Sequence, residues 1–436
     1  MMQLLKWSEL SDESRIAALA RPESRQSASV TDVVRTVFEA VTQEGDAAVA
    51  RFAQEFDGFA PRRLELTERV VAAARNSVDQ ADYEALQAAA RNIEMFHKAE
   101  PVDGYETDIA PGLRCARVMR PLRAVGLYVP GGTAPLFSTL LMLAIPALIA
   151  GVDEIIICTP PDKNGNVHPF IILAAAVCRI PAIYVVGGTQ AVAALSTGTD
   201  MIPKVDIIAG PGNAYVTAAK TYAASLPDGP VIDMPAGPSE LMVIADDTAD
   251  PGIVAADLLS QAEHDVMAQV VLVTTSDELI AAVQVELERQ LQTLPRAEIA
   301  REALGNGKII LVQGIQEAVS ISNQYAPEHL SLNTHAADKL VDMISTAGTV
   351  FVGGWAAETF GDYAAGPSHV LPTDGAARKW SGVCVATFLR SMTVQQVTQA
   401  GIQGLAETSA RLARLEGLEA HARAADIRLA TLGGLT

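Results

Sequence analysis

Gln261 and His264 stand three positions apart where an apolar-periodic segment, residues 251–259, comes to an end. If that segment is a helix and continues for one more turn, both side chains project from the same face. An amide oxygen beside an imidazole nitrogen would then form half of a metal site. The same residue types also occur as a cap and a solvated side chain at helix ends, so the pair needs partners from elsewhere in the chain.

Glu328 and His329 are adjacent and come just before an expected strand. Neighbouring side chains on an extended chain diverge, so these two would approach a bound substrate from different sides instead of bonding each other. Such a pair could supply two separate acid–base functions. The alternative is a solvated glutamate at a strand start beside a buried, hydrogen-bonded histidine.

Further carboxylates and imidazoles occur later in the chain. Asp362 and His369 lie in the segment 361–369, which we expect to be a long loop after a strand. An aspartate in such a loop can bind a metal or cap a turn. Glu416 and His421 are five positions apart in an expected helix, a spacing that an ordinary surface helix also has.

The candidate ligands form a set of nitrogen and oxygen donors without a thiolate: Gln261, His264, Asp362 and His421. Such a set suits zinc at a catalytic site, or manganese or cobalt at a higher coordination number. A thiolate-bound structural zinc is excluded, because the four cysteines are widely spaced and form no CxxC motif: Cys115, Cys158, Cys178 and Cys384. We expect them to be reduced core thiols of a cytoplasmic protein.

Three glycine-rich turns follow expected strands, at residues 130–133, 187–190 and 210–213. Backbone N–H groups can approach a phosphate closely at such turns, and the next helix presents its positive end. Three turns of this kind in one sheet favour a nucleotide ligand. None completes a GxGxxG motif, and each alone is also explained as an ordinary turn of an α/β fold.

The elements that would position these residues alternate between strand and helix. The expected strands fall in two series, residues 124–129, 154–158, 182–186 and 205–209, and then residues 241–245, 269–274, 308–312, 330–333 and 349–352. This alternation implies right-handed crossovers and parallel sheets covered on both faces, with ligands at the carboxyl ends of the strands. The chain before residue 120 and the segment 392–428 have helical periodicity.

Composition excludes several functions. A formal charge of -19 and a pI near 4.8 argue against a nucleic-acid partner, because phosphates require clustered Lys and Arg. The longest apolar run, residues 140–150, is far shorter than the roughly 20 residues that span a bilayer, so we expect no membrane segment. The start of the chain lacks the basic-then-apolar order of a signal peptide.

Six motifs resemble the histidinol dehydrogenase family, in the order in which that family has them. The resemblance extends from about Val30 to His421, nearly the whole chain. The motifs are Gly126-Leu127-Tyr128-Val129-Pro130-Gly131-Gly132, Gly210-Pro211-Gly212-Asn213-Ala214, Asp233-Met234-Pro235-Ala236-Gly237-Pro238-Ser239-Glu240, Leu259-Ser260-Gln261-Ala262-Glu263-His264, Tyr325-Ala326-Pro327-Glu328-His329-Leu330 and His369-Val370-Leu371-Pro372-Thr373.

The resemblance implies a zinc enzyme that oxidises L-histidinol through L-histidinal to L-histidine with two NAD, the last two steps of histidine biosynthesis. Glu328 and His329 match the family's catalytic pair. The zinc ligands would be Gln261, His264, Asp362 and His421, the NAD contacts Tyr128, Gln190 and Asn213, and the substrate contacts Ser239, His369 and Glu416 together with the zinc ligands and His329.

The resemblance also implies a homodimer with one zinc ion per subunit. In this family the C-terminal helical segment reaches the partner's active site, so Glu416 and His421 would serve the other subunit. One departure is the sequence Gly366-Pro367-Ser368-His369, where many members carry an Asn before the His. This departure concerns the detail of the loop and not His369 itself.

The family has two incomplete Rossmann-like domains, which agrees with the incomplete glycine motif. We therefore expect an α/β fold with parallel sheets and helical segments at both ends. The expected divisions are an N-terminal helical segment at 1–29, a first α/β domain at 30–122 and 239–380 with the metal and catalytic residues, a second at 123–238 on the NAD side, and a C-terminal helical segment at 381–436 that reaches the partner.

Two other functions are alternatives to the oxidation of histidinol. A related zinc and NAD dehydrogenase could oxidise another small alcohol, such as a sulfonated diol. Glu416 favours histidinol, because a carboxylate attracts the cationic groups of histidinol and repels a sulfonate. A noncatalytic metal-dependent binding protein could have kept the same fold, but the intact Glu328 and His329 speak against it.

Overall fold

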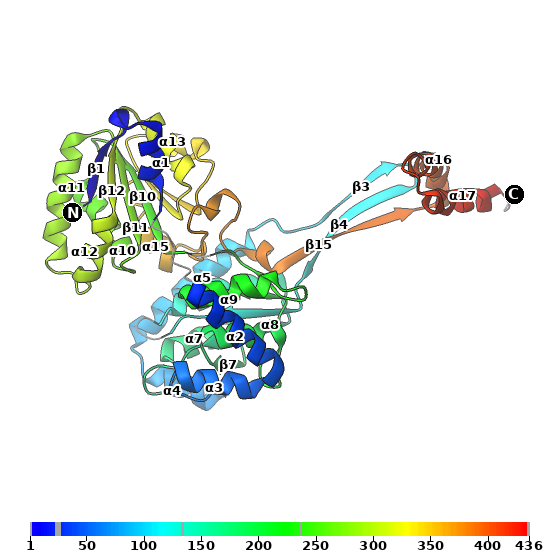
Figure 1. Cartoon of the computed structure of the whole chain (residues 1–436), viewed down its shortest axis with the longest axis horizontal. Coiled ribbons are helices and arrows are strands. Elements are labelled where there is room, and N and C mark those ends of the chain that lie inside the picture. Colours follow the sequence, from blue (N-terminus) through cyan, green and yellow to red (C-terminus); the bar gives the residue numbers. More distant parts are fainter. Residues whose placement is uncertain (1, 22–27, 132–134, 236, 434–436) are drawn as a thin grey trace. The chain divides into compact units, whose positions relative to one another are not determined.

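The computed structural model describes residues 2–21, 28–131, 135–235 and 237–433 (Figure 1). The chain divides into two compact units. The first unit consists of Met1–Ala99 and Arg123–Phe388, and the second of Glu100–Leu122 and Leu389–Thr436. Gly132, Thr133 and Ala236, which belong to the glycine turns and motifs named above, lie outside the described residues.

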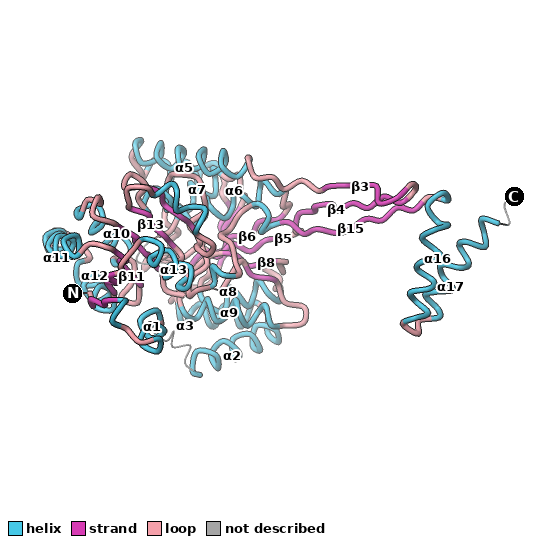
Figure 2. The backbone as a smooth tube through the Cα atoms, turned by 90° about the horizontal axis from the view of Figure 1, so that it is seen from above, coloured by secondary structure: helices cyan, strands magenta, loops and turns pink. Residues whose placement is uncertain are grey.

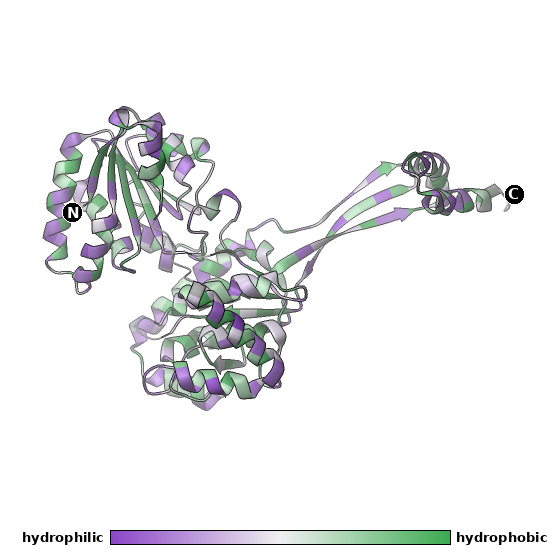
Figure 3. Cartoon of the chain, viewed as in Figure 1, coloured by the Kyte–Doolittle hydropathy of each residue, from purple (hydrophilic) through white to green (hydrophobic). Residues whose placement is uncertain are grey.

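A parallel sheet in the first unit contains the second series of expected strands. Its strand order is β1-β12-β11-β10-β13-β14, with every neighbouring pair parallel. The strands are β1 (Gln3–Lys6), β10 (Glu240–Ala245), β11 (Gln269–Thr274), β12 (Lys308–Leu311), β13 (His329–Asn333) and β14 (Thr349–Val352). The central strands β10 and β11 are buried throughout and largely hydrophobic in Figure 3, as expected for strands that are covered on both faces, whereas the edge strand β1 is mostly exposed.

Alternate residues of β10 point into two different cores. Leu241 and Val243 pack with helices α10 (Pro251–Ala262), α11 (Asp277–Leu291) and α12 (Ala297–Asn306). Met242 and Ile244 pack on the other face with α1 (Asp12–Leu19), α13 (Ile315–Tyr325) and α14 (Ala337–Leu340). The carboxyl-terminal part of α10 and the start of β13 are therefore anchored by buried neighbours, and these two elements carry the first two candidate residue pairs.

A second sheet in the same unit has the order β2-β7-β6-β5-β8-β9. Its strands are β2 (Arg62–Glu65), β5 (Ala124–Tyr128), β6 (Glu154–Thr159), β7 (Ala182–Val185), β8 (Ile207–Ala209) and β9 (Val231–Ile232). Only β2 runs antiparallel to its neighbour within this sheet as described.

Eight helices cover this second sheet. One core contains residues from α2 (Ala28–Glu44), α3 (Asp46–Phe56), α8 (Gly188–Thr197) and α9 (Ala214–Ser225). The other four helices are α4 (Glu68–Asn76), α5 (Gln80–Lys98), α6 (Phe137–Ala150) and α7 (Pro169–Val177). Helix α5 packs against α6, and α7 packs against both α4 and α6. Helix α6 is buried over most of its length, which explains why its sequence is apolar on all sides.

The second unit is an antiparallel three-stranded sheet followed by two helices. The strand order is β15-β4-β3, formed by β15 (Leu389–Val397), β4 (Leu113–Pro121) and β3 (Tyr105–Ala110). Figure 2 shows these strands side by side, leading to α16 (Gln399–Leu415) and α17 (Glu419–Gly433). The two helices pack against each other.

The α/β class, the two series of parallel strands and the helices near both ends agree with the sequence prediction, but five strands also lie in the segments with helical periodicity. Strands β1, β2, β3 and β4 lie before residue 122, and β15 occupies part of the segment from 392 onwards. Every residue of β3 is exposed, and β2 is an edge strand of four residues. Neither strand has the apolar alternation that marks a half-buried strand in a sequence.

The structure also divides the chain differently from the expected boundaries. Helices α2 and α3 pack on α8, and β2 pairs with β7, so residues 30–99 belong with the second sheet, which we call the NAD-side sheet after its expected ligand. Residues 100–122 belong to the second unit. At the start of the chain, β1 pairs with β12 of the first sheet, β1-β12-β11-β10-β13-β14, which we call the metal-side sheet after its expected ligand. Helical periodicity indicates which face of a helix is buried, but it does not indicate which sheet buries it.

Among the described helices, none is both long enough and apolar enough to cross a membrane. Of the cysteines, Cys158 and Cys178 are buried, whereas Cys115 and Cys384 are half-buried.

Candidate active site

Gln261 and His264 lie at the carboxyl end of α10 and line one pocket of about 150 Å³. Helix α10 ends at Ala262, so His264 is placed by a turn and not by a further helical turn as expected. The His264 N–H donates to the carbonyl oxygen of Gln261 over 3.2 Å. The Gln261 side chain is fully buried, and neither its amide oxygen nor its amide nitrogen has a partner. A buried amide without a hydrogen bond is costly, so this position favours a ligand.

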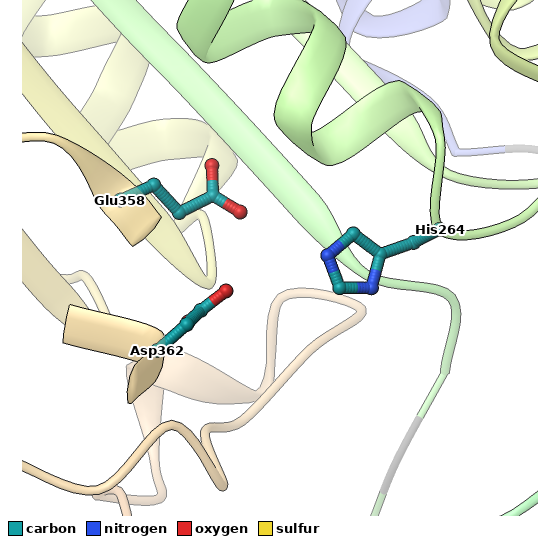
Figure 4. Close-up of side chains that lie close together, drawn as sticks. All are labelled: His264, Glu358 and Asp362. Atoms are coloured by element: carbon teal, nitrogen blue, oxygen red, sulfur yellow. The ribbon is translucent and has the colours of Figure 1, made fainter. Parts of the chain in front are cut away.

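Asp362 belongs to the short helix α15 (Glu358–Tyr363), so the expectation that it lies in a loop is wrong. The helix places Asp362 one turn after Glu358, and both carboxylates therefore point to the same side. Figure 4 shows them opposite the His264 ring. The potential ligand atoms of His264, Glu358 and Asp362 all lie within 4.8 Å of one another.

Glu358 is the functional candidate that sequence reasoning missed. Its side chain is 2% exposed, and both carboxylate oxygens lack a partner. Burial, assisted by the negative charges of Asp362 and Glu328, raises the pKa of Glu358 to about 8. The signal in the sequence was the four-residue spacing from Glu358 to Asp362, which becomes visible only if the segment is recognised as a helix.

Glu328 and His329 are held by the backbone of one residue, Glu240. The Glu240 N–H donates to Glu328 Oε2 over 2.8 Å, and His329 Nδ1 lies 3.0 Å from the Glu240 carbonyl oxygen. A carbonyl oxygen only accepts, so Nδ1 carries the proton and Nε2 has the free lone pair of the neutral ring. His329 Nε2 has no hydrogen-bond partner and lies 3.6 Å from Asp362 Oδ1.

The two side chains lie closer together than their expected divergence implied. Glu328 Oε2 is 3.6 Å from His329 Nδ1, which is too long for a hydrogen bond but close enough for the charges to interact. Glu328 is 5% exposed, so the alternative of a solvated glutamate is wrong. The pair shares an anchor in Glu240 instead of approaching from opposite sides.

The charges around this pair shift both pKa values. Burial raises the pKa of Glu328 to about 7. Burial lowers the pKa of His329, but the carboxylates of Glu328, Glu358 and Asp362 outweigh it and raise that pKa to about 10. A divalent cation beside these carboxylates would compensate much of their charge and bring the imidazole back towards its ordinary pKa. The pKa of His264 is lowered, chiefly by burial, which favours the neutral, ligating form of its ring.

Ser239 and His369 line the same pocket from other segments. His369 Nδ1 donates to the carbonyl oxygen of Asp362 over 2.7 Å, and Nε2 lies 2.8 Å from Thr139 Oγ1. Burial lowers the pKa of His369, so its neutral ring accepts a hydrogen bond from Thr139 at Nε2. His369 thereby connects the metal-side residue Asp362 to α6.

The expected NAD residues do not line this pocket. Tyr128 ends β5, and its hydroxyl oxygen accepts the Gly188 N–H over 3.0 Å. Gln190 is fully buried and donates from Nε2 to Asp57 over 3.2 Å. Asn213 is exposed and caps α9, accepting the N–H groups of the second and third helical residues at 3.1 Å each.

Gly210 is one of several glycines in the NAD-side turns that leave no room for a side chain. Gly210 has φ of +121°, and a Cβ there would lie 2.1 Å from the Tyr128 carbonyl oxygen. Buried Lys220 holds this turn. Its Nζ donates to the Gly210 carbonyl oxygen over 2.7 Å and forms an ion pair with buried Asp233 at 2.5 Å. This turn is therefore held by buried partners, and its residues Gly210 and Pro211 line the pocket.

Glu416 and His421 belong to the second compact unit, whereas the pocket belongs to the first. Glu416 caps the end of α16, Gly417 turns the chain with φ of +77°, and His421 lies in α17. The two residues therefore come from different helices, and the expectation of one helical stretch is wrong. Both side chains are exposed within the chain.

The residues of the pocket fit a divalent metal ion. Gln261, His264, Asp362 and Glu358 supply oxygen and nitrogen donors, and sulfur is absent from this set. The unpartnered amide of Gln261 and the unpartnered carboxylate of Glu358 are what a cation would satisfy. Such a donor set suits zinc in a site that leaves room for substrate.

Known proteins resemble the chain over its whole length. The family model for histidinol dehydrogenase matches residues 19–429. The histidinol dehydrogenase of Xanthomonas euvesicatoria is 46% identical over 98% of this chain and 99% of its own length. The putative histidine biosynthesis bifunctional protein HisCD of Photorhabdus laumondii is 45% identical over 98% of this chain, which spans only 53% of that longer protein.

A solved structure gives the same result. The crystal structure of histidinol dehydrogenase from Elizabethkingia anophelis superposes with a TM-score of 0.94, at 42% sequence identity, and covers 99% of both chains. The matched residues include those of both compact units. The fold, the pocket and the sequence similarity agree that this chain belongs to the histidinol dehydrogenase family, a family of oxidoreductases.

Proposed function

We propose that this protein oxidises L-histidinol through L-histidinal to L-histidine in histidine biosynthesis, with NAD as the hydride acceptor in both steps. Membership of the family over the whole chain supports this proposal. The single observation that carries it is the pocket in which a free imidazole nitrogen, a buried carboxylate and an unsatisfied set of metal donors meet.

Gln261, His264 and Asp362 would hold the zinc ion, together with His421 from a partner subunit. A bound zinc ion supplies a template for the amine and imidazole nitrogens of the substrate, and so fixes the alcohol carbon in place. His421 is exposed within the chain and belongs to the second compact unit, which does not contain the pocket residues. Its side chain is therefore open to binding a zinc ion held by another chain. We accordingly propose a homodimer with shared active sites and one zinc ion per subunit.

His329 is the base of the first step. Its Nδ1–H is committed to the Glu240 carbonyl oxygen, so Nε2 is free to take the proton of the alcohol as the first hydride leaves for NAD. Glu328 then activates water for attack on the aldehyde, and its carboxylate is oriented by the Glu240 N–H. His329 releases its first proton to solvent, and in the second step its Nε2 takes the hydrate's proton as the second hydride leaves.

Tyr128, Gln190 and Asn213 are the proposed NAD contacts. Tyr128 and Asn213 stand at the carboxyl ends of neighbouring strands β5 and β8, where ligands of α/β sheets bind. Gln190 is fully buried against Asp57 in this structure, so its contribution would come through the Gly187–Gly188 turn that Asp57 also holds.

Ser239, His369 and Glu416 are the proposed substrate contacts, in addition to the metal ligands and His329. Ser239 faces the pocket directly. Glu416, from a partner subunit, would attract the cationic substrate. We also propose a cytoplasmic location, in keeping with a biosynthetic role that uses NAD.

The proposal is tested by NADH formation from zinc-loaded enzyme with L-histidinol and, separately, with L-histidinal. We expect both substrates to be oxidised, with two NADH per histidinol, and activity to be lost on chelation and restored by zinc. A sulfonated diol is the substrate of the rival function, which the family comparisons do not favour. Oxidation of the diol with no oxidation of histidinol would refute the proposal.

Shared active sites are tested separately with hybrid dimers. A His421→Asn chain and a His329→Asn chain are each expected to be inactive alone. When they are mixed and allowed to exchange subunits, one site of the hybrid has both intact residues, so part of the activity should return. Failure to recover activity in dimers proven to be hybrid would refute the sharing of sites.

A further inference from the structure

Arg21 lies just after α1 and reaches buried groups of the metal-side sheet. Its Nη2 donates to Glu240 Oε2 over 2.8 Å, and its Nε donates to the other oxygen of the same carboxylate. The two side chains are 15% and 2% exposed. A two-pronged bond between a guanidinium and a carboxylate fixes both groups in direction as well as distance.

Glu240 is the residue whose backbone holds the proposed catalytic pair. Its N–H donates to Glu328 Oε2, and its carbonyl oxygen accepts from His329 Nδ1. Glu240 is also the first residue of β10, where the chain enters the sheet. The side chain of this residue is thus held by Arg21 while its main chain holds Glu328 and His329.

Arg21 also binds the turn that leads into the catalytic pair. Its Nη2 donates to the carbonyl oxygen of Tyr325 over 2.9 Å and to that of Ala326 over 3.3 Å. The guanidinium lies over the Tyr325 ring, 3.8 Å from its centre. Ala326 has φ of +56°, a left-handed conformation that costs a residue with a side chain some free energy. The bonds from Arg21 help to hold this turn two residues before Glu328.

The fourth segment that meets here contains Asp374. Its N–H donates to Glu240 Oε1 over 3.0 Å, and its Oδ1 lies 3.9 Å from Arg21 Nε. The preceding residue, Thr373, lines the pocket and accepts the Gly237 N–H. Arg21 therefore joins the N-terminal segment to each of the chain segments that bring Glu328, His329 and Thr373 to the pocket.

We propose that Arg21 is a positioning residue for the oxidation reaction, holding Glu328 and His329 in place through Glu240 and the turn at residues 325–326. Arg21 does not itself line the pocket, so it acts only through these groups. The inference rests on the proposed function, because it requires Glu328 and His329 to carry the chemistry.

The test compares Arg21→Lys with Arg15→Lys in zinc-loaded enzyme. Lysine keeps the charge but cannot bind both carboxylate oxygens and two carbonyl oxygens at once. We expect kcat of Arg21→Lys to fall about tenfold to a hundredfold for both histidinol and histidinal, since small displacements of catalytic groups have effects of this size. KM for histidinol and zinc content per chain should stay near the wild-type values.

Arg15→Lys is the matched control. Arg15 belongs to the same N-terminal segment and donates to the Trp7 carbonyl oxygen at 3.3 and 3.2 Å, without reaching Glu240. Its kcat should equal that of the wild type. An Arg21→Gly variant leaves space for free guanidinium, which should bind Glu240 in place of the lost side chain. Addition of guanidinium chloride should therefore restore kcat per bound zinc, a recovery that an unfolded enzyme would not show.

Glu240→Gln is a second variant for the case that Arg21→Lys does not fold. It removes the charge of the carboxylate and so weakens the bond between Arg21 and Glu240. A folded Arg21→Lys or Glu240→Gln enzyme with wild-type kcat for both substrates would overturn the inference. The proposed function fails in a different way, namely if His329→Asn and Glu328→Gln retain wild-type activity. Loss of activity in those two variants with full activity in Arg21→Lys would refute the role of Arg21 alone.

Discussion

The carboxyl ends of the two sheets in the first unit differ in how far their polar groups are satisfied. On the metal-side sheet, Gln261, Glu358 and His329 have buried polar atoms without a partner. On the NAD-side sheet, the Tyr128 hydroxyl, the Asn213 side chain and the Lys220–Asp233 pair all have partners within the protein. Exceptions on that side are the amide oxygen of Gln190 and the hydroxyl of Thr159 at the end of β6, which have none.

This difference indicates how each edge works. A cation and a substrate at the metal-side edge would supply the missing partners, because buried polar atoms without partners are costly. More of the polar groups at the NAD-side edge have protein partners, and this edge offers a backbone turn held by Lys220 to a ligand. Substitutions at the first edge should therefore change chemistry and metal binding, whereas substitutions at the second should change cofactor affinity by smaller factors.

The largest effect is expected for His329→Asn. Removing a general base typically lowers turnover by about 10² to 10⁴. We expect a loss in this range for both histidinol and histidinal, with zinc still bound at the wild-type ratio. Steady-state kinetics together with metal analysis would check it. Loss of zinc in parallel with loss of turnover would instead make His329 part of the metal site.

Glu328→Gln should affect only one half of the reaction. Without a carboxylate to activate water, oxidation of histidinal should slow by about 10² or more, while oxidation of histidinol to the aldehyde continues. Single-turnover measurements with each substrate would separate the two steps. An equal loss in both would contradict the division of labour between Glu328 and His329.

Removal of the metal should make stability depend on pH. In the metal-free protein the pKa of Glu358 is raised to about 8, above its ordinary value of 4.5. Between these values the folded protein binds a proton that the unfolded chain does not, so the free energy of unfolding should fall as pH rises from about 5 to about 8. Urea unfolding at several pH values would measure this slope.

Glu358→Gln is the variant that isolates this effect. The substitution should flatten the slope in metal-free protein, and it should also weaken zinc binding by about tenfold to a hundredfold, as loss of a group near a metal commonly does. Chelator competition would measure the zinc affinity. An unchanged slope and an unchanged affinity would show that the Glu358 carboxylate is irrelevant to the cation.

The smallest effect is expected on the NAD side, for Asn213→Ala. Loss of the cap should cost about 1 kcal/mol of stability and raise KM for NAD about threefold to tenfold, with kcat nearly unchanged. Ser276→Ala is a matched control, because Ser276 caps α11 through the Leu279 N–H and does not line the pocket. It should lose similar stability and keep the wild-type KM. Equal KM values in the two variants would remove Asn213 from the NAD site.

The sequence predicted nine of the twelve strands that the structure describes in the two sheets, because continuous apolar runs separated by glycine turns are a strong local signal. It missed the short strands β1, β2 and β9. It also predicted seven of the residues that line the pocket, namely Ser239, Gln261, His264, Glu328, His329, Asp362 and His369. Their prediction used the residue types and the resemblance to a family. Both are visible in the sequence without knowledge of the fold.

The sequence did not predict Glu358, Arg21 or the exposed strands of the second unit. Glu358 lies on a helix of six residues, which is too short to show periodicity. Arg21 is separated from Glu240 by 219 positions, and only the folded chain brings them together. Strand β3 has no buried face within the chain, so no pattern of apolar residues marks it.

The most direct test of the central claim is anomalous diffraction at the zinc edge from crystals of the zinc-loaded protein. We expect one peak per chain, within about 2.0 to 2.2 Å of donor atoms from Gln261, His264 and Asp362, with His421 of the partner subunit completing the site. A zinc peak elsewhere, or coordination that leaves Gln261 and His264 without contact to the ion, would contradict it.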